Sequence, residues 1–122
     1  MRVTRLLLAL MGTLALLLPM SACAAPASVP VDTNTVVLDV RTPDEYAAGH
    51  LEGAKLLDLN SGEFEAALPD LDPNASYAVY CRSGNRSAKA VALMTKAGFA
   101  NVKDLGAMND AAKSTGLAVV TG

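Results

Sequence analysis

The sequence of 122 residues has few of the residue types that build metal sites or disulfide frameworks. It contains one histidine, His50, and two cysteines, Cys23 and Cys81. Because a structural zinc site takes four ligands, mostly cysteine and histidine, we expect neither a metal nor another cofactor. His50 lies in a predicted helix-to-strand connection, away from Cys81 in the sequence, so we interpret it as structural.

Basic residues and tryptophan are also scarce. Ten Lys and Arg stand against 12 Asp and Glu, for a formal charge of −2, and tryptophan is absent. No basic patch indicates a nucleic-acid partner. No internal repeat and no second apolar span follow the N-terminal stretch, so the remaining chain, about 100 residues, fits one domain with a modest core.

The N-terminus has the features of a bacterial secretory signal. Arg2 and Arg5 precede an apolar run over residues 6–18, which is shorter than the roughly 20 residues of a membrane span. We predict a signal peptide over residues 1–24, a Pro/Ala/Ser linker over 25–31 and a domain over 32–122. Without Arg2 and Arg5, the mature chain has a formal charge of −4.

Two cleavage schemes remain open. Ala22-Cys23-Ala24 is an A-x-A site that would release a soluble product, which we favour slightly. Met20-Ser21-Ala22-Cys23 is similar to a lipobox, so that the signal would be residues 1–22 and Cys23 would carry a lipid anchor. Both schemes predict an exported, periplasmic or cell-envelope protein in which Cys81 has no disulfide partner.

Strands and helices alternate along the predicted domain. β-Branched and apolar runs predict strands over 36–40, 54–57, 77–80 and 102–105, and an ending strand or extended tail over 117–120. Helices are expected from Pro43 to Gly49, over 61–68 (stopped by Pro69), over 85–97 and over 108–115. Lys89 and Lys96 mark the one solvent-facing stripe expected on the 85–97 helix. This order predicts an α/β fold with a mostly parallel sheet and helices on both faces.

The first of these helices has a clear start signal. Thr42 fits an N-cap, Pro43 fits the first helical position, and Glu45 completes a capping box. We expect Asp39, at the end of the preceding strand, to accept hydrogen bonds from loop N–H groups. Arg41 is predicted to pair with Glu45 across the first turn.

The segment from Cys81 to Ser87 connects a strand to a helix, at the sheet edge where α/β folds bind ligands. Backbone N–H groups and the helix dipole make this loop positive, and Arg82 and Arg86 add formal charge. Such surroundings lower a thiol pKa from about 8.5 into the range of about 3.5–7.5. Gly84 permits a turn that a Cβ would hinder. The predicted nucleophile is therefore Cys81.

The remaining loop residues are assigned supporting roles. Arg86 closes the loop and is the stronger candidate for binding substrate oxygens, whereas Arg82 can point outward. The expected substrate-binding set is Arg82, Ser83, Gly84, Asn85 and Arg86, and the expected supporting set is Asp39, Arg41 and Ser87. No general base is needed, because the loop itself activates the thiolate. We predict a two-step cycle in which Cys81 takes a sulfur atom as a persulfide and then passes it on.

Three blocks together resemble the rhodanese family: residues 39–54 its N-terminal signature, 81–87 its active-site loop, and 98–102 with 105–106 its third block. The single-domain exported form is similar to periplasmic phage-shock rhodaneses. The resemblance implies thiosulfate sulfurtransferase activity with Cys81 as persulfide carrier, anion binding by residues 82–86, and scaffolding by Asp39 and Arg41. The family often has Gly-Gly and then Trp where this chain has Gly106-Ala107-Met108, which affects the expected pocket wall.

The partners expected from these features are a small anionic donor such as thiosulfate and, as acceptor, cyanide or another small nucleophile or a protein thiol. We expect a monomer that contacts membrane only through a lipid anchor on Cys23. A phosphatase is disfavoured, because its loop has five residues between Cys and Arg, whereas four separate Cys81 from Arg86. A sulfur carrier, a redox sensor and a protein-binding module remain open alternatives.

Overall fold

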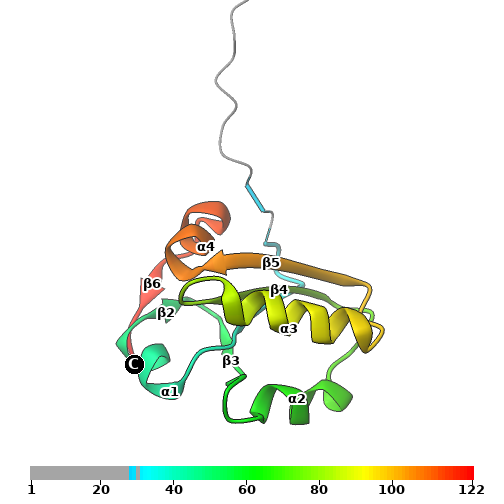
Figure 1. The fold of residues 1–122 in the computed structure, drawn as a ribbon. Helices are drawn as coiled ribbons and strands as arrows, with labels where there is room; N and C mark the ends of the chain where they lie inside the picture. The colour runs from blue at the N-terminus through cyan, green and yellow to red at the C-terminus, as the bar shows by residue number, and fades with distance from the viewer. Residues whose placement is uncertain (1–27, 30) are drawn as a thin grey trace, which may run out of the picture.

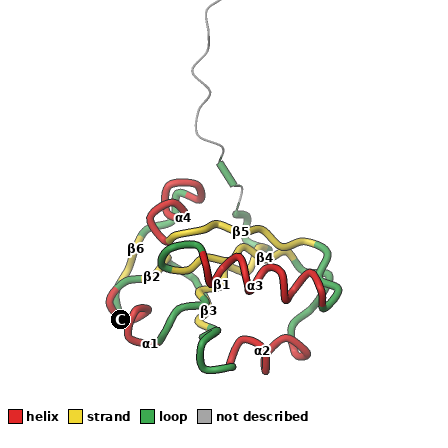
Figure 2. The backbone as a smooth tube through the Cα atoms, viewed as in Figure 1, coloured by secondary structure: helices red, strands yellow, loops and turns green. Residues whose placement is uncertain are grey.

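Four parallel strands form the central sheet in the computed structural model, which describes residues 28–29 and 31–122. Their order across the sheet is β3-β1-β4-β5 (Figure 1, with β1 labelled in Figure 2). The strands are β1 (Thr35–Asp39), β3 (Lys55–Leu56), β4 (Ser76–Cys81) and β5 (Asn101–Ala107). The prediction of a parallel α/β sheet is confirmed.

Helices cover both faces of this sheet, as predicted. Successive strand residues point to opposite faces, so Leu38 packs with α2 (Glu63–Ala67) and α3 (Asn85–Lys96), while the neighbouring Val37 packs with α4 (Met108–Thr115). Figure 2 shows α3 running across one face of the strands. Two apolar clusters, one on each side, therefore fix the sheet between its helices.

Helix α1 (Pro43–Ala48) begins and ends where the sequence predicts. The Glu45 N–H donates to Thr42 Oγ1 at 3.3 Å, and the Thr42 N–H donates to Glu45 Oε2 at 2.9 Å. Pro43 occupies the first helical position, and Gly49 is the C-cap. The capping box is confirmed, and it fixes the orientation of the Glu45 carboxylate.

Two local expectations need correction. Pro69 does not stop the structure after α2, because it lies within a 3₁₀ helix, η1 (Leu68–Asp70), near whose start a missing N–H is tolerated. The exposed face of α3 is broader than one lysine stripe, since Ala88 and Ala92 are exposed beside Lys89 and Lys96. Alanine favours helix without needing burial.

A second, two-stranded sheet pairs β2 (His50–Leu51) with β6 (Val119–Val120) in antiparallel fashion. The C-terminal segment is thus a strand, and β2 is an element that the sequence did not predict. At Gly122, the backbone N–H donates to the Ala47 carbonyl at 3.1 Å. The end of the chain is therefore held against α1, beside the edge of the sheet where β1 and β4 end.

Val29 and Val31, which fall in the predicted linker, pack against the core on the α4 side. The Val29 N–H donates to the Ser114 carbonyl at 3.0 Å. The predicted signal peptide lies outside the described residues. Within residues 28–29 and 31–122, no helix has the length and apolar character that crossing a membrane requires.

Candidate active site

Cys81 is the last residue of β4, at the carboxyl edge of the sheet, and it is fully buried. The chain then turns through Arg82 and Ser83 and enters α3, with Gly84 as the N-cap. Gly84 has φ of 101°, in the left-handed region where other L-residues are strained. This glycine lets the chain turn back over the sulfur atom before the helix begins.

The sulfur of Cys81 receives hydrogen bonds from this turn. The Gly84 N–H donates to Sγ at 2.9 Å, and Ser87 Oγ lies 3.5 Å from Sγ. Burial raises the pKa of the Cys81 thiol, but hydrogen bonds from the Ser87 hydroxyl and from the backbone of Ser87, Gly84 and Ser83 outweigh it. The net effect is a lowered pKa, which favours the thiolate; this direction agrees with the prediction from the loop sequence, and the causes are hydrogen bonds from the turn.

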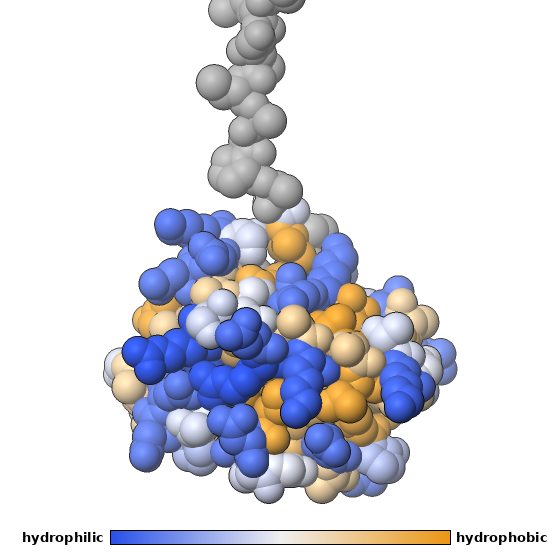
Figure 3. Space-filling model, in the orientation of Figure 1, coloured by the Kyte–Doolittle hydropathy of each residue, from blue (hydrophilic) through white to orange (hydrophobic). Residues whose placement is uncertain are grey.

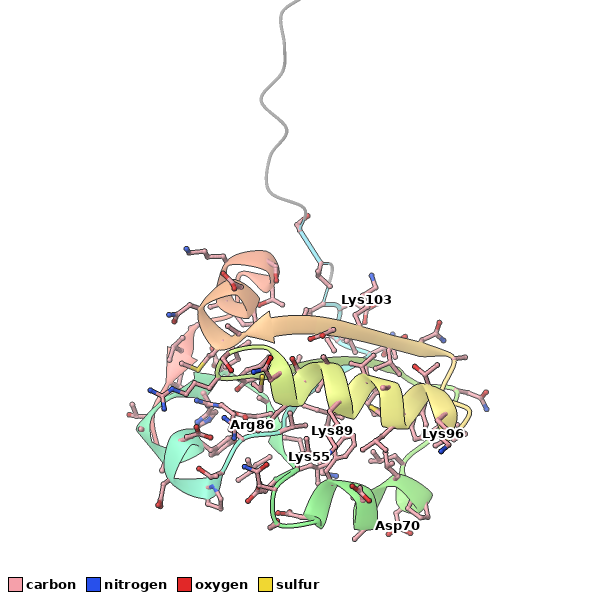
Figure 4. All side chains as sticks on the ribbon, in the orientation of Figure 1. Lys55, Asp70, Arg86, Lys89, Lys96 and Lys103 are labelled. Atoms are coloured by element: carbon pink, nitrogen blue, oxygen red, sulfur yellow. The ribbon has the colours of Figure 1, made fainter. Side chains whose placement is uncertain are left out.

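Arg86 projects from the first turn of α3 toward α1 (Figure 4). Its two terminal nitrogens donate to the two oxygens of Glu45 at 2.9 and 3.0 Å. The Arg86 hydrogen bonds, against the cost of burial, hold the pKa of Glu45 at about 2. The residue predicted to bind substrate oxygens is therefore paired with a carboxylate of this chain.

The predicted pair between Arg41 and Glu45 is wrong. Arg41 instead donates from Nε and Nη2 to the Asp39 carboxylate, at 2.7–3.1 Å, and from Nη2 to the Gly49 carbonyl at 2.6 Å. Arg41 precedes the N-cap Thr42, so it is not on the helical surface where residues four apart meet.

Asp39 lies at the centre of a buried network beneath the site. It accepts the Arg41 N–H at 3.0 Å, as expected of a loop N–H, and the Tyr80 hydroxyl at 2.7 Å. That hydroxyl in turn accepts the Leu51 N–H at 3.0 Å. Burial, assisted by Asp39, raises the pKa of Tyr80, so the phenol stays a donor. The network connects β1, β2 and β4 next to Cys81.

A pocket of about 350 Å³ opens beside the loop. It is lined by Arg41, Glu45, Ala48, Gly49, Arg82, Met108, Asn109 and Val119. Met108 occupies the wall for which the sequence lacks the expected tryptophan, and Val119 of β6 was not predicted to contribute. Figure 3 shows hydrophilic side chains gathered over the region between α1 and the start of α3. A hollow of equal volume lies at the opposite edge of the sheet, near Thr35 and Ser76, away from Cys81.

The other candidate residues differ in their exposure. Arg82, Ser83 and Asn85 are exposed. His50 is buried, with Nδ1 2.8 Å from the Tyr46 carbonyl and its ring stacked on Tyr46, as a structural histidine would be. Among the described residues, no group of three or more His, Cys, Asp or Glu side chains is placed to hold a metal ion.

Comparisons with known proteins agree with this geometry. The family model of the rhodanese-like domain matches residues 27–110. Thiosulfate sulfurtransferase PspE of Escherichia coli K12 is 31% identical over 91 residues, covering 75% of this chain and 88% of that protein. Thiosulfate sulfurtransferase GlpE of Pseudomonas entomophila is 44% identical over 69 residues, covering 57% of this chain and 62% of that protein.

A solved structure described as a rhodanese with anions from E. coli is 27% identical, with a TM-score of 0.61. The alignment covers 72% of this chain and 99% of that one. The family match thus agrees with the resemblance seen in three separate blocks of the sequence, and it favours the rhodanese over the phosphatase interpretation of the Cys81 loop. The chain belongs to the rhodanese-like domain family.

Proposed function

We propose that the protein is a sulfurtransferase that carries sulfur on Cys81. The thiolate attacks the outer sulfur of thiosulfate, the S–S bond of the donor breaks, and sulfite leaves with the electron pair. An acceptor such as cyanide or a thiol then attacks the outer sulfur of the persulfide and regenerates the thiolate. The observation that supports this cycle is the Cys81 sulfur, held by the Gly84 N–H at 2.9 Å at the head of α3.

Donor binding is assigned to the turn itself and to Arg82. Backbone N–H groups at the head of a helix bind anions, and those of Ser83, Gly84 and Ser87 surround the sulfur. Arg82 lines the adjacent pocket and forms no ion pair with the part of the chain described. The Ser83 and Asn85 side chains, predicted to bind substrate, lie in the same turn and are exposed. No cofactor takes part in this proposal.

The test is the intact mass of the purified protein before and after thiosulfate, beside Cys81→Ser. We expect the wild type to gain one sulfur atom, which cyanide removes, and the variant to fold but gain none. A loaded Cys81→Ser protein would place the nucleophile elsewhere. A reactive but unloaded Cys81 in the wild type would favour a redox role over sulfur transfer.

We also propose that the protein acts as an exported monomer, periplasmic or attached to the cell envelope. Cys23 is the residue that distinguishes the two forms. If it carries a lipid anchor, Cys23→Ala moves the protein from the membrane fraction to the soluble fraction. Unchanged partitioning of the variant would support the soluble product.

A further inference from the structure

The positive charge at the site is smaller than the sequence indicates. Three arginines surround the loop, but Arg41 is paired with Asp39 and Arg86 is paired with Glu45. Within residues 28–29 and 31–122, Arg82 is the arginine of the three without a carboxylate partner. An anionic donor therefore meets one unpaired guanidinium and the N–H groups of the turn.

Glu45 is well restrained in the position that pairs with Arg86. Its carboxylate accepts two hydrogen bonds from Arg86 and one from the Thr42 N–H, and its side chain is 24% exposed. Bidentate pairs between arginine and carboxylate are among the stronger charged hydrogen bonds. Glu45 also lines the pocket beside the loop, together with Arg82. A second negative charge on the donor thus competes with Glu45 for Arg86.

We propose that Glu45 is a positioning residue that sets the donor charge this site prefers. By keeping Arg86 paired, it disfavours doubly charged donors relative to singly charged ones. The inference rests on the proposed sulfur transfer and adds to it a discrimination between classes of donor. Glu45 acts through Arg86 and does not touch the reacting sulfur.

Two donors of the same chemistry test this discrimination. Thiosulfate carries two negative charges, whereas methanethiosulfonate carries one, with a methyl group in place of one oxygen. Each delivers its outer sulfur to the Cys81 thiolate as the S–S bond breaks, and the leaving group, sulfite or methanesulfinate, takes the electron pair. The two reactions differ mainly in the charge that the site must accept.

The variant is Glu45→Gln, since glutamine also serves in a capping box and keeps an acceptor for the Thr42 N–H. We expect its KM for thiosulfate to fall about two- to fivefold, the range of partly exposed charge pairs, with kcat unchanged. The KM for methanethiosulfonate falls less. Glu63→Gln, which removes an exposed carboxylate from α2, is the matched control and changes neither KM.

A second pair of variants separates positioning from simple charge. Glu45→Asp keeps the negative charge but shortens the reach to Arg86, so the KM for thiosulfate falls in this variant too, although less. In an Arg86→Gln background, Glu45→Gln no longer shifts the ratio of the two KM values. An undiminished shift there would mean that Glu45 repels the donor directly, and this would overturn the positioning role.

Equal changes for both donors, or no change for either, would also overturn the inference. Thermal melting shows whether each variant is folded. If Glu45→Gln is unfolded, the KM values of Glu45→Asp provide the test instead. Failure of the wild type to gain sulfur would instead contradict the proposed function. A wild type that loads normally, beside a Glu45→Gln protein with unaltered KM values, would contradict the donor preference alone.

Discussion

The pKa of the Cys81 thiol is lowered by neighbours that are close in sequence. Ser87 Oγ lies 3.5 Å from Sγ and donates to the Gly84 carbonyl at 3.1 Å, so its proton can turn toward the sulfur when the thiolate forms. We therefore expect Ser87→Ala to raise the pKa of the Cys81 thiol. Alkylation by iodoacetamide would slow in the variant around neutral pH, while the plateau rate at high pH would stay close to that of the wild type.

Ser83→Ala is the control for this prediction. Ser83 donates its backbone N–H to the sulfur, and its side chain is exposed. We therefore expect Ser83→Ala to have the same pH dependence of the alkylation rate as the wild type. A Ser87→Ala profile that overlays the wild type would show that the backbone N–H groups alone set the thiol pKa.

Residue contacts could be predicted where the partners are close in sequence and not where the partner is distant. The loop around Cys81 spans only residues 81–87, so its sequence predicts the turn that the structure shows around the sulfur, and the role of Cys81 as nucleophile stays a prediction. The partner of Arg86 is Glu45, 41 residues away, and no local pattern specifies that pair. The expected partner of Arg41 is wrong because Arg41 lies before the helix, where residues four apart do not share a helical face.

At the scale of elements, a buried network holds together the strand ends that support the site. Asp39→Asn would leave the Arg41 guanidinium buried without its carboxylate, at a side-chain exposure of 5%. Breaking a buried ion pair from one side costs about 3–5 kcal/mol, and we expect a loss of that size in the free energy of unfolding in urea.

Tyr80→Phe is the comparison for Asp39→Asn, because we expect a smaller loss in the free energy of unfolding. It removes one donor to Asp39 and leaves the Leu51 N–H without its acceptor, which costs about 1–3 kcal/mol. A loss in Asp39→Asn no larger than that in Tyr80→Phe would mean that the charge of Asp39 is not what stabilises the network.

Sequence patterns identified the elements that have an apolar run or start and stop signals of their own, including β3, which has only two residues. The β1 strand, the capped α1 helix and α3 after the Cys81 turn all follow such signals. β2 also has two residues, but it has no β-branched run of its own, and it exists because β6 returns to pair with it. The wall that Val119 adds to the pocket depends on that long-range pairing, so no local pattern indicates it.

For the whole molecule, the parallel sheet explains why residues from separate parts of the chain meet at one edge. Asp39 and Cys81 lie at the ends of neighbouring strands, and α1 and α3 both begin just beyond that edge. The pair of Glu45 and Arg86 connects these two helices across the site. Its loss should therefore affect the stability of the folded chain as well as donor preference.

Acid titration isolates that contribution. The pKa of Glu45 falls from 4.5 to about 2 on folding, so its stabilisation is complete above about pH 4.5 and is lost as the pH falls toward 2. We expect the wild type to be more stable than Glu45→Gln at neutral pH, with the difference shrinking between about pH 4.5 and 2. Arg86→Gln should show the same narrowing, since it removes the main cause of the shift. Urea unfolding at a series of pH values measures the free energy of unfolding of each protein. If the difference between wild type and Glu45→Gln stays constant down to pH 2, Arg86 does not stabilise the ionised Glu45.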